Sequence, residues 1–98
     1  MLQRLGDNDP IQVSGQINFD SVLRYRRLGE EFIKSNNEVE LKFDLSKAEI
    51  SGSIGVSLLL CWVRAANNAG KKLAFQQIPV TLCEMIRVSG VEQILAVD

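Results

Sequence analysis

The spacing of hydrophobic residues switches between strand and helix periods along this chain. Val39, Leu41 and Phe43 alternate with polar residues, as in a half-buried strand, whereas the apolar residues between 20 and 35 follow a helical stripe. The patterns predict strands at 2–5, 11–17, 39–44 and 72–76, and helices at 20–35, 54–69 and 80–88. Residues 91–97 form a last short element whose type the pattern leaves open.

The order of these elements predicts an α/β fold. Two strands come first, and helices and strands then alternate, so right-handed crossovers would place the strands in one sheet. We therefore expect a small α/β sandwich, with a mixed sheet of four to five strands and helices packed mainly on one face. At 98 residues, with 46% apolar residues, the chain suits one core, and we expect 1–98 to form a single domain.

Composition excludes several classes of function. The chain has no histidine, and its only cysteines are Cys61 and Cys83, so neither a serine–histidine–carboxylate triad nor a zinc site is expected. A net charge of −1 disfavours nucleic-acid binding. The longest apolar run, 54–63, is too short to span a bilayer, and no phosphate-binding loop motif is present. We expect a protein that is not an enzyme and needs no cofactor or metal.

The segment before the second predicted helix is the most informative. The predicted strand ends at Asp44, whose carboxylate we expect to brace the following loop through backbone N–H groups. Ser51-Gly52-Ser53 then opens the helix. Helix starts expose unpaired N–H groups that suit an anion, a phosphorylated serine or an oxygen of a partner protein. Alternatively, Ser51 or Ser53 only caps the helix.

The second predicted helix is apolar around most of its circumference. Trp62 belongs to the stripe that a sheet would cover, and we expect it to serve in packing. Val56, Leu59, Leu60 and Val63 extend the apolar surface beyond that stripe. Two interpretations stay open: neighbouring helices cover this second face, or part of the first two turns docks on another protein.

Three motifs together resemble the STAS domain family, which includes anti-sigma-factor antagonists and modules of sulfate transporters. Asp44-Leu45-Ser46 is followed nine residues later by Gly55 at the opening of the apolar helix, and the segments 70–73 and 87–91 continue the pattern. The chain looks most similar to the branch that forms the cytoplasmic STAS subunit of Mla-type phospholipid ABC transporters. The resemblance covers most of the chain from about residue 11.

The resemblance also carries implications for single positions. The serine that is phosphorylated in the antagonist branch falls on Ile54, which has no hydroxyl, and the acidic residue of that motif falls on Gly52. No phosphorylation is therefore expected at position 54, and Ser53 is a weak alternative acceptor. Ser53 falls where the transporter branch carries a threonine important for contact with its partner, which implies a similar contact or capping role.

The resemblance implies a non-catalytic accessory subunit that binds the ATPase subunit of a lipid-transporting ABC complex and helps to maintain outer-membrane lipid asymmetry. Such a subunit is cytoplasmic and reaches the inner membrane only through its complex, without membrane insertion. The expected contact residues are Ser51, Gly52, Ser53, Ile54, Ser57 and Leu58. The alternative is an anti-sigma-factor antagonist-like protein that binds a kinase-like anti-sigma factor through the same face.

Overall fold

The alternating periods of the sequence correspond to four strands and four helices in the part of the chain that the computed structural model describes, residues 1–4, 6, 9–50 and 52–95. In chain order these elements are β1 (Leu2–Arg4), β2 (Ile11–Ile17), α1 (Val22–Ser35), β3 (Glu40–Ile50), α2 (Gly52–Asn68), β4 (Lys72–Gln76), α3 (Val80–Ser89) and α4 (Glu92–Leu95). The uncertain last element is thus helical over 92–95, whereas residues 96–97 lie outside the described part.

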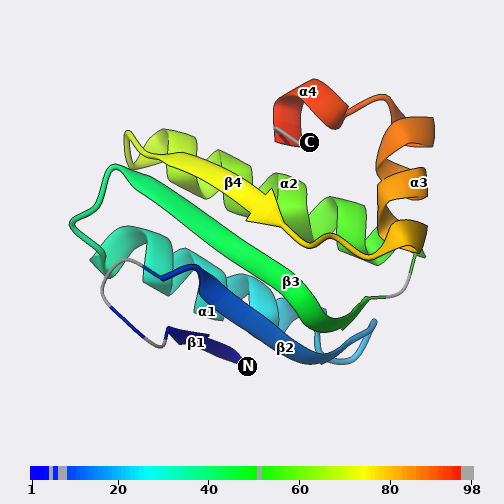
Figure 1. Ribbon diagram of the computed structural model, residues 1–98, viewed down its shortest axis with the longest axis horizontal. Helices are drawn as coiled ribbons and strands as arrows, with labels where there is room; N and C mark the ends of the chain where they lie inside the picture. The colour runs from blue at the N-terminus through cyan, green and yellow to red at the C-terminus, as the bar shows by residue number, and fades with distance from the viewer. Residues whose placement is uncertain (5, 7–8, 51, 96–98) are drawn as a thin grey trace.

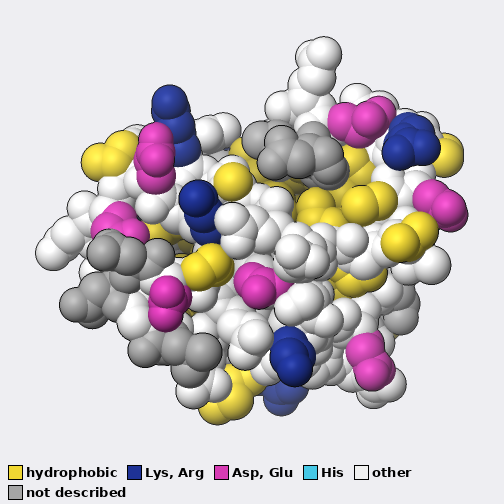
Figure 2. Space-filling model, viewed as in Figure 1, with side chains coloured by type: hydrophobic (Ala, Val, Ile, Leu, Met, Phe, Trp, Pro, Cys, Tyr) yellow, Lys and Arg dark blue, Asp and Glu magenta, His cyan; other side chains and the backbone are white. Residues whose placement is uncertain are grey.

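The strands form one mixed sheet in the order β1-β2-β3-β4, which confirms the expected fold class. β1 is antiparallel to β2, and β2, β3 and β4 are parallel to one another. In Figure 1 the sheet lies in front of α1 and α2, so both crossover helices cover the same face. The opposite face presents mainly polar and charged side chains, with hydrophobic ones scattered among them (Figure 2).

The predicted end of the third strand is wrong. β3 continues through Ile50 and stays paired with β2, where Ile17 lies opposite Ile50. The pairing register with β2 shifts between Gln12 and Ser14, so β3 has one extra residue there. As a result the buried residues of β3 have odd numbers before the shift and even numbers after it, and the alternation of the strand is interrupted in the sequence. The Asp44 carboxylate accepts a hydrogen bond of 2.8 Å from the Ser46 N–H, so the predicted brace exists, within a strand rather than a loop.

Neighbouring elements cover the second apolar face of α2. Both α3 and α4 contact this helix, and their Leu82, Ile86 and Leu95 side chains are buried in the same core (Figure 1). Of the four positions that left two interpretations open, Leu60 is half-buried against the core, and Val56, Leu59 and Val63 are buried. Their burial favours the first interpretation, since these side chains are not available for docking on another protein.

Candidate functional site

Three helix starts gather at one end of the molecule. β2, β3 and β4 run in parallel, so the segments that follow them, and the first turns of α1, α2 and α3, lie at the carboxyl end of the sheet (Figure 1). This end is the usual place for recognition in α/β proteins, because loops there are held by rigid strands. The contact residues expected from the sequence belong to the α2 start within this group.

The structure places these expected residues in three different environments. Ser53 is exposed in the first turn of α2, and Ser57 is exposed one turn later on the same side of the helix. Ile54, the next residue after Ser53, is half-buried, and Gly52 is exposed, with no atom within 4 Å of the position of an added Cβ. Ser51 lies outside the described residues.

Leu58 differs from the sequence-based expectation. Its side chain is only 2% exposed, so it packs in the core rather than standing on the surface beside Ser53. The few atoms that remain accessible line a hollow of about 170 Å³ between α1 and α2. Leu58 therefore supports the surface from beneath, and a charged substitution there would test folding rather than docking.

The hollow brings residues of α1 next to the predicted site. Val22, Leu23 and Arg26 form one side and Ser57 and Cys61 the other. Leu23 is 52% exposed and adds apolar surface beside Ser57. Sequence reasoning missed Leu23, although its position outside the apolar stripe of the helix was a usable signal, because an apolar residue on a polar face indicates contact or packing outside the core.

Gly55 fixes the start of α2 against the end of β3. A Cβ at this position would lie 2.3 Å from Ile50 Cγ2 and 2.8 Å from Leu82 Cδ1, closer than real side-chain contacts. Only glycine therefore allows β3, α2 and α3 to meet here. This close approach gives a physical reason for the glycine of the sequence motif, and it holds Ser53 and Ile54 at a defined place at the end of the sheet.

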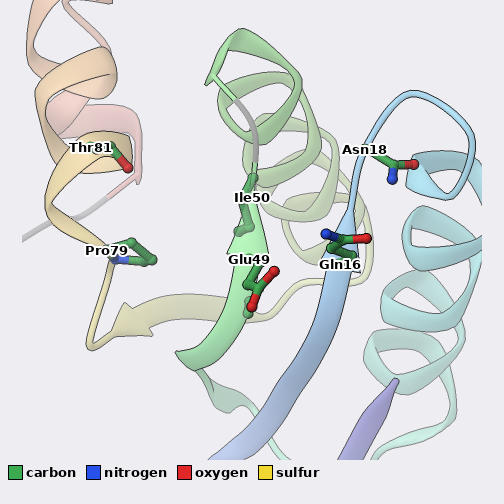
Figure 3. Close-up of a pocket in the computed structure, with 7 residues that line it drawn as sticks. Gln16, Asn18, Glu49, Ile50, Pro79 and Thr81 are labelled. Atoms are coloured by element: carbon green, nitrogen blue, oxygen red, sulfur yellow. The ribbon is translucent and has the colours of Figure 1, made fainter.

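A second hollow, of about 360 Å³, lies at the same end of the molecule (Figure 3). β2 and the segment after it contribute Gln16 and Asn18, β3 contributes Ala48, Glu49 and Ile50, and the start of α3 contributes two more residues. Its lining residues at that helix start are Pro79 and Thr81. Nothing in the sequence pattern indicated this hollow, since it depends on the extension of β3 past the end of β4.

Neither metal chemistry nor membrane crossing finds support in the described residues. Within 1–4, 6, 9–50 and 52–95, no three His, Cys, Asp or Glu side chains are grouped so that they could hold a metal ion. In the same part of the chain, no helix combines the length and the apolar character that crossing a membrane would require. What distinguishes the site is its exposed serines and apolar side chains.

Comparison with known families and proteins gives one family match. The family model described as "Mlab, STAS domain" matches residues 1–96, which is nearly the whole chain. Among curated proteins, none matches this chain with statistical significance.

Solved structures of similar fold include a chain of an Mla complex and two forms of an anti-sigma factor antagonist. A chain of the Acinetobacter MlaFEDB complex in an ATP-bound conformation superimposes with a TM-score of 0.80 at 23% identity, over 93% of this chain and 95% of that one. The unphosphorylated anti-sigma factor antagonist SpoIIAA superimposes with a TM-score of 0.73 at 15% identity, over 100% of this chain and 86% of SpoIIAA. SpoIIAA of Bacillus in its phosphorylated form superimposes with a TM-score of 0.68 at 15% identity, over 100% of this chain and 89% of that one. At these identities the likeness concerns the fold.

Proposed function

Because the chain belongs to the STAS domain family, we propose that it is a non-catalytic accessory subunit that binds the ATPase subunit of a lipid-transporting ABC complex. The observation that carries this proposal is the match of the MlaB-type family model over residues 1–96. The similarity in fold to a chain of the MlaFEDB complex supports it. In this role the protein acts on the cytoplasmic side, held at the inner membrane by its complex, and helps to maintain outer-membrane lipid asymmetry.

The proposed interface is centred on Ser53. This serine and Ser57 are exposed on one side of α2, the adjacent Ile54 is half-buried, and Leu23 of α1 is exposed beside the hollow that Ser57 lines. No residue from 52 to 58 carries a charge. Such a surface suits a partner patch of short polar and apolar side chains, and a standard interface would bury roughly 800 Å² on each partner.

Binding affects the ATPase only through a difference in affinity between its conformations. A subunit that binds the active arrangement more tightly than the inactive one shifts the ATPase toward activity, whereas equal binding to both changes nothing. A preference of about 3 kcal/mol shifts the ratio of the two conformations by roughly two orders of magnitude. We therefore expect the accessory subunit to raise ATP hydrolysis by the complex without hydrolysing ATP itself.

The proposal is tested by measuring binding of purified variants to the ATPase subunit encoded in the same gene cluster. Ser53→Arg places a long charged side chain at the centre of the proposed interface and should weaken binding at least about tenfold. Leu23→Asp should weaken it as well. Ser89→Arg makes the same chemical change at the exposed last residue of α3 and should bind like the wild type.

Circular dichroism and thermal unfolding must first show that all three variants are folded. Wild-type binding that survives both Ser53→Arg and Leu23→Asp would mean that the interface lies elsewhere. A wild-type protein that neither binds the ATPase subunit nor changes the activity of the complex would contradict the function itself.

The second candidate function is that of an anti-sigma-factor antagonist. The similarity in fold to SpoIIAA covers 100% of this chain, and Ser53 offers an exposed hydroxyl next to the position of Ile54. Incubation with ATP and a kinase-like anti-sigma factor, followed by intact-mass measurement, separates the two functions. One added phosphate in the wild type that is absent from Ser53→Ala would favour this second candidate.

A further inference from the structure

β3 extends beyond the end of its neighbour β4. The pairing of the two strands runs from Glu40 opposite Lys72 to Asp44 opposite Gln76, and β4 ends there. On its other side β3 remains paired with β2 as far as Ile50. Residues 46–50 therefore have a strand on one side only. The Ser46 N–H already donates to the Asp44 carboxylate, and the other outward backbone groups of this stretch make no backbone hydrogen bond to another described element, so residues 46–50 form a stretch of sheet edge without a neighbouring strand.

The second hollow lies beside this stretch. In Figure 3 Pro79 and Thr81 face Glu49 and Ile50 across the hollow, and Gln16 and Asn18 lie on the other side of β3. Pro79 has no N–H and α3 turns away after it, so the start of this helix does not satisfy the edge of β3. The hollow thus borders the place that β4 would fill if it continued, and it extends past β3 to Gln16 and Asn18.

The polar lining of the hollow indicates what it can hold. Gln16 and Thr81 offer hydrogen-bonding side chains, and Glu49 brings a carboxylate that makes no ion pair with any residue of the described part. The Asn18 side-chain oxygen is already used, because it accepts hydrogen bonds from the N–H groups of Asp20 and Ser21. A negative charge in the lining disfavours an anion such as phosphate and favours a cationic group.

We propose that residues 46–50 of β3 accept an extended segment of a partner protein, which adds to the sheet as a strand in line with β4 and places a lysine or arginine against Glu49. Strand addition is a common mode of peptide recognition, in which main-chain hydrogen bonds supply affinity and side-chain contacts supply specificity. At about 3.3 Å per residue, the free edge spans roughly 16 Å, enough for a segment of about five residues. The main-chain hydrogen bonds and the contact with Glu49 do not depend on which protein supplies the segment. The proposal of strand addition therefore does not rest on the proposed binding to the ATPase subunit.

The experiment selects phage-displayed random linear peptides on the folded full-length chain and measures the affinity of the enriched peptides by fluorescence anisotropy. Thr81→Trp fills the hollow from the exposed first turn of α3 and should weaken binding at least about tenfold. Val80→Trp is the matched control, since Val80 is 74% exposed, neighbours Thr81 and does not line the hollow. It should change the affinity by less than about twofold.

Two further measurements distinguish strand addition from other binding. N-methylation of alternate residues in an enriched peptide should abolish binding when the methylated N–H groups face β3, and leave it intact for the other set. Glu49→Gln should weaken binding and flatten its dependence on salt. Hydrogen exchange of the amides in 46–50 should slow when the peptide is bound.

Several results would overturn the proposal. They are the failure to enrich any peptide, equal binding by Thr81→Trp and the wild type, or tolerance of N-methylation at every position. Dimers in solution that disappear in Thr81→Trp would instead assign the edge to a second copy of the chain. None of these measurements uses the ATPase subunit. A negative result would therefore contradict strand addition without bearing on the proposed binding to the ATPase subunit.

Discussion

Replacing Gly29 by alanine tests how α1 is held against α2. Gly29 is buried in α1, where the indole of Trp62 fills the space that a side chain would take. A Cβ at this position would lie 2.1 Å from Trp62 Nε1 and 2.3 Å from Cε2. Two effects of the substitution therefore oppose each other, a gain in helix propensity and a steric clash with a buried ring.

The structure decides which effect is larger. Alanine in place of glycine in a helix interior stabilises by about 1 kcal/mol. Overpacking a core costs about 1–3 kcal/mol, and the upper end applies here, because Trp62 has no exposed surface and its ring packs edge-on against Phe43 at 4.9 Å between centroids. The net loss is about 2 kcal/mol. For a domain of this size that corresponds to a melting temperature lower by about 8–16 °C.

The assay is urea and thermal unfolding of Gly29→Ala, Trp62→Phe and the double variant. Trp62→Phe removes the Nε1 that the added Cβ would meet, together with the hydrogen bond of 3.2 Å that this nitrogen donates to the Arg26 carbonyl. In the Trp62→Phe background, Gly29→Ala should destabilise the protein only slightly or stabilise it. The double-mutant cycle should therefore show a coupling free energy above about 1 kcal/mol between the two positions. A Gly29→Ala protein that is more stable than the wild type, or an equal cost in both backgrounds, would refute the packing argument.

Two further substitutions test the side-chain hydrogen bonds that hold α1. The Lys71 ammonium donates to the carbonyls of Ile33 and Asn36 at the end of α1, so Lys71→Met should lower the free energy of unfolding by about 1–2 kcal/mol in urea. The Tyr25 hydroxyl donates to the Ser14 carbonyl at 2.7 Å, and Tyr25→Phe should cost about 1 kcal/mol by thermal unfolding. A loss below about 0.3 kcal/mol in either variant would show that water replaces the bond without cost.

Periodicity predicted most of the fold, because burial on one face imposes the period directly. β2 and β4 begin and end where the pattern placed them, at 11–17 and 72–76. β3 is the exception, and the reason is local. Its extra residue between Asp44 and Lys47 exchanges the buried and exposed positions, so a strand continues where the pattern indicates a loop. A bulge depends on the partner strand, which a single stretch of sequence does not contain.

The candidate site was predictable only in part. Ser53 and Ser57 stand on the surface as a docking site requires, and they precede a helix that the sequence identified. Leu58 lies four residues before Trp62, in the stripe that faces the core, so helical spacing alone argues for its burial. The expectation of a surface role for Leu58 came from its proximity in sequence to Ser53, which on a helix is a poor guide to proximity on a face.

The two proposed contact surfaces, at Ser53 and along the edge of β3, are held by the same contact between β3, α2 and α3. Binding at one surface can therefore affect the affinity at the other. The free edge of β3 ends at Ile50, which touches the position of Gly55 in the first turn of α2, and Leu82 of α3 closes the same contact. Ser53 and the hollow at Thr81 therefore sit on a fixed frame at the carboxyl end of the sheet, and neither needs ordering before the other is used. A single partner that covers the serines and also supplies the added strand would gain from the high effective concentration of its second segment, because the first contact already holds that segment nearby. Two modest surfaces would then give tight binding without a large interface.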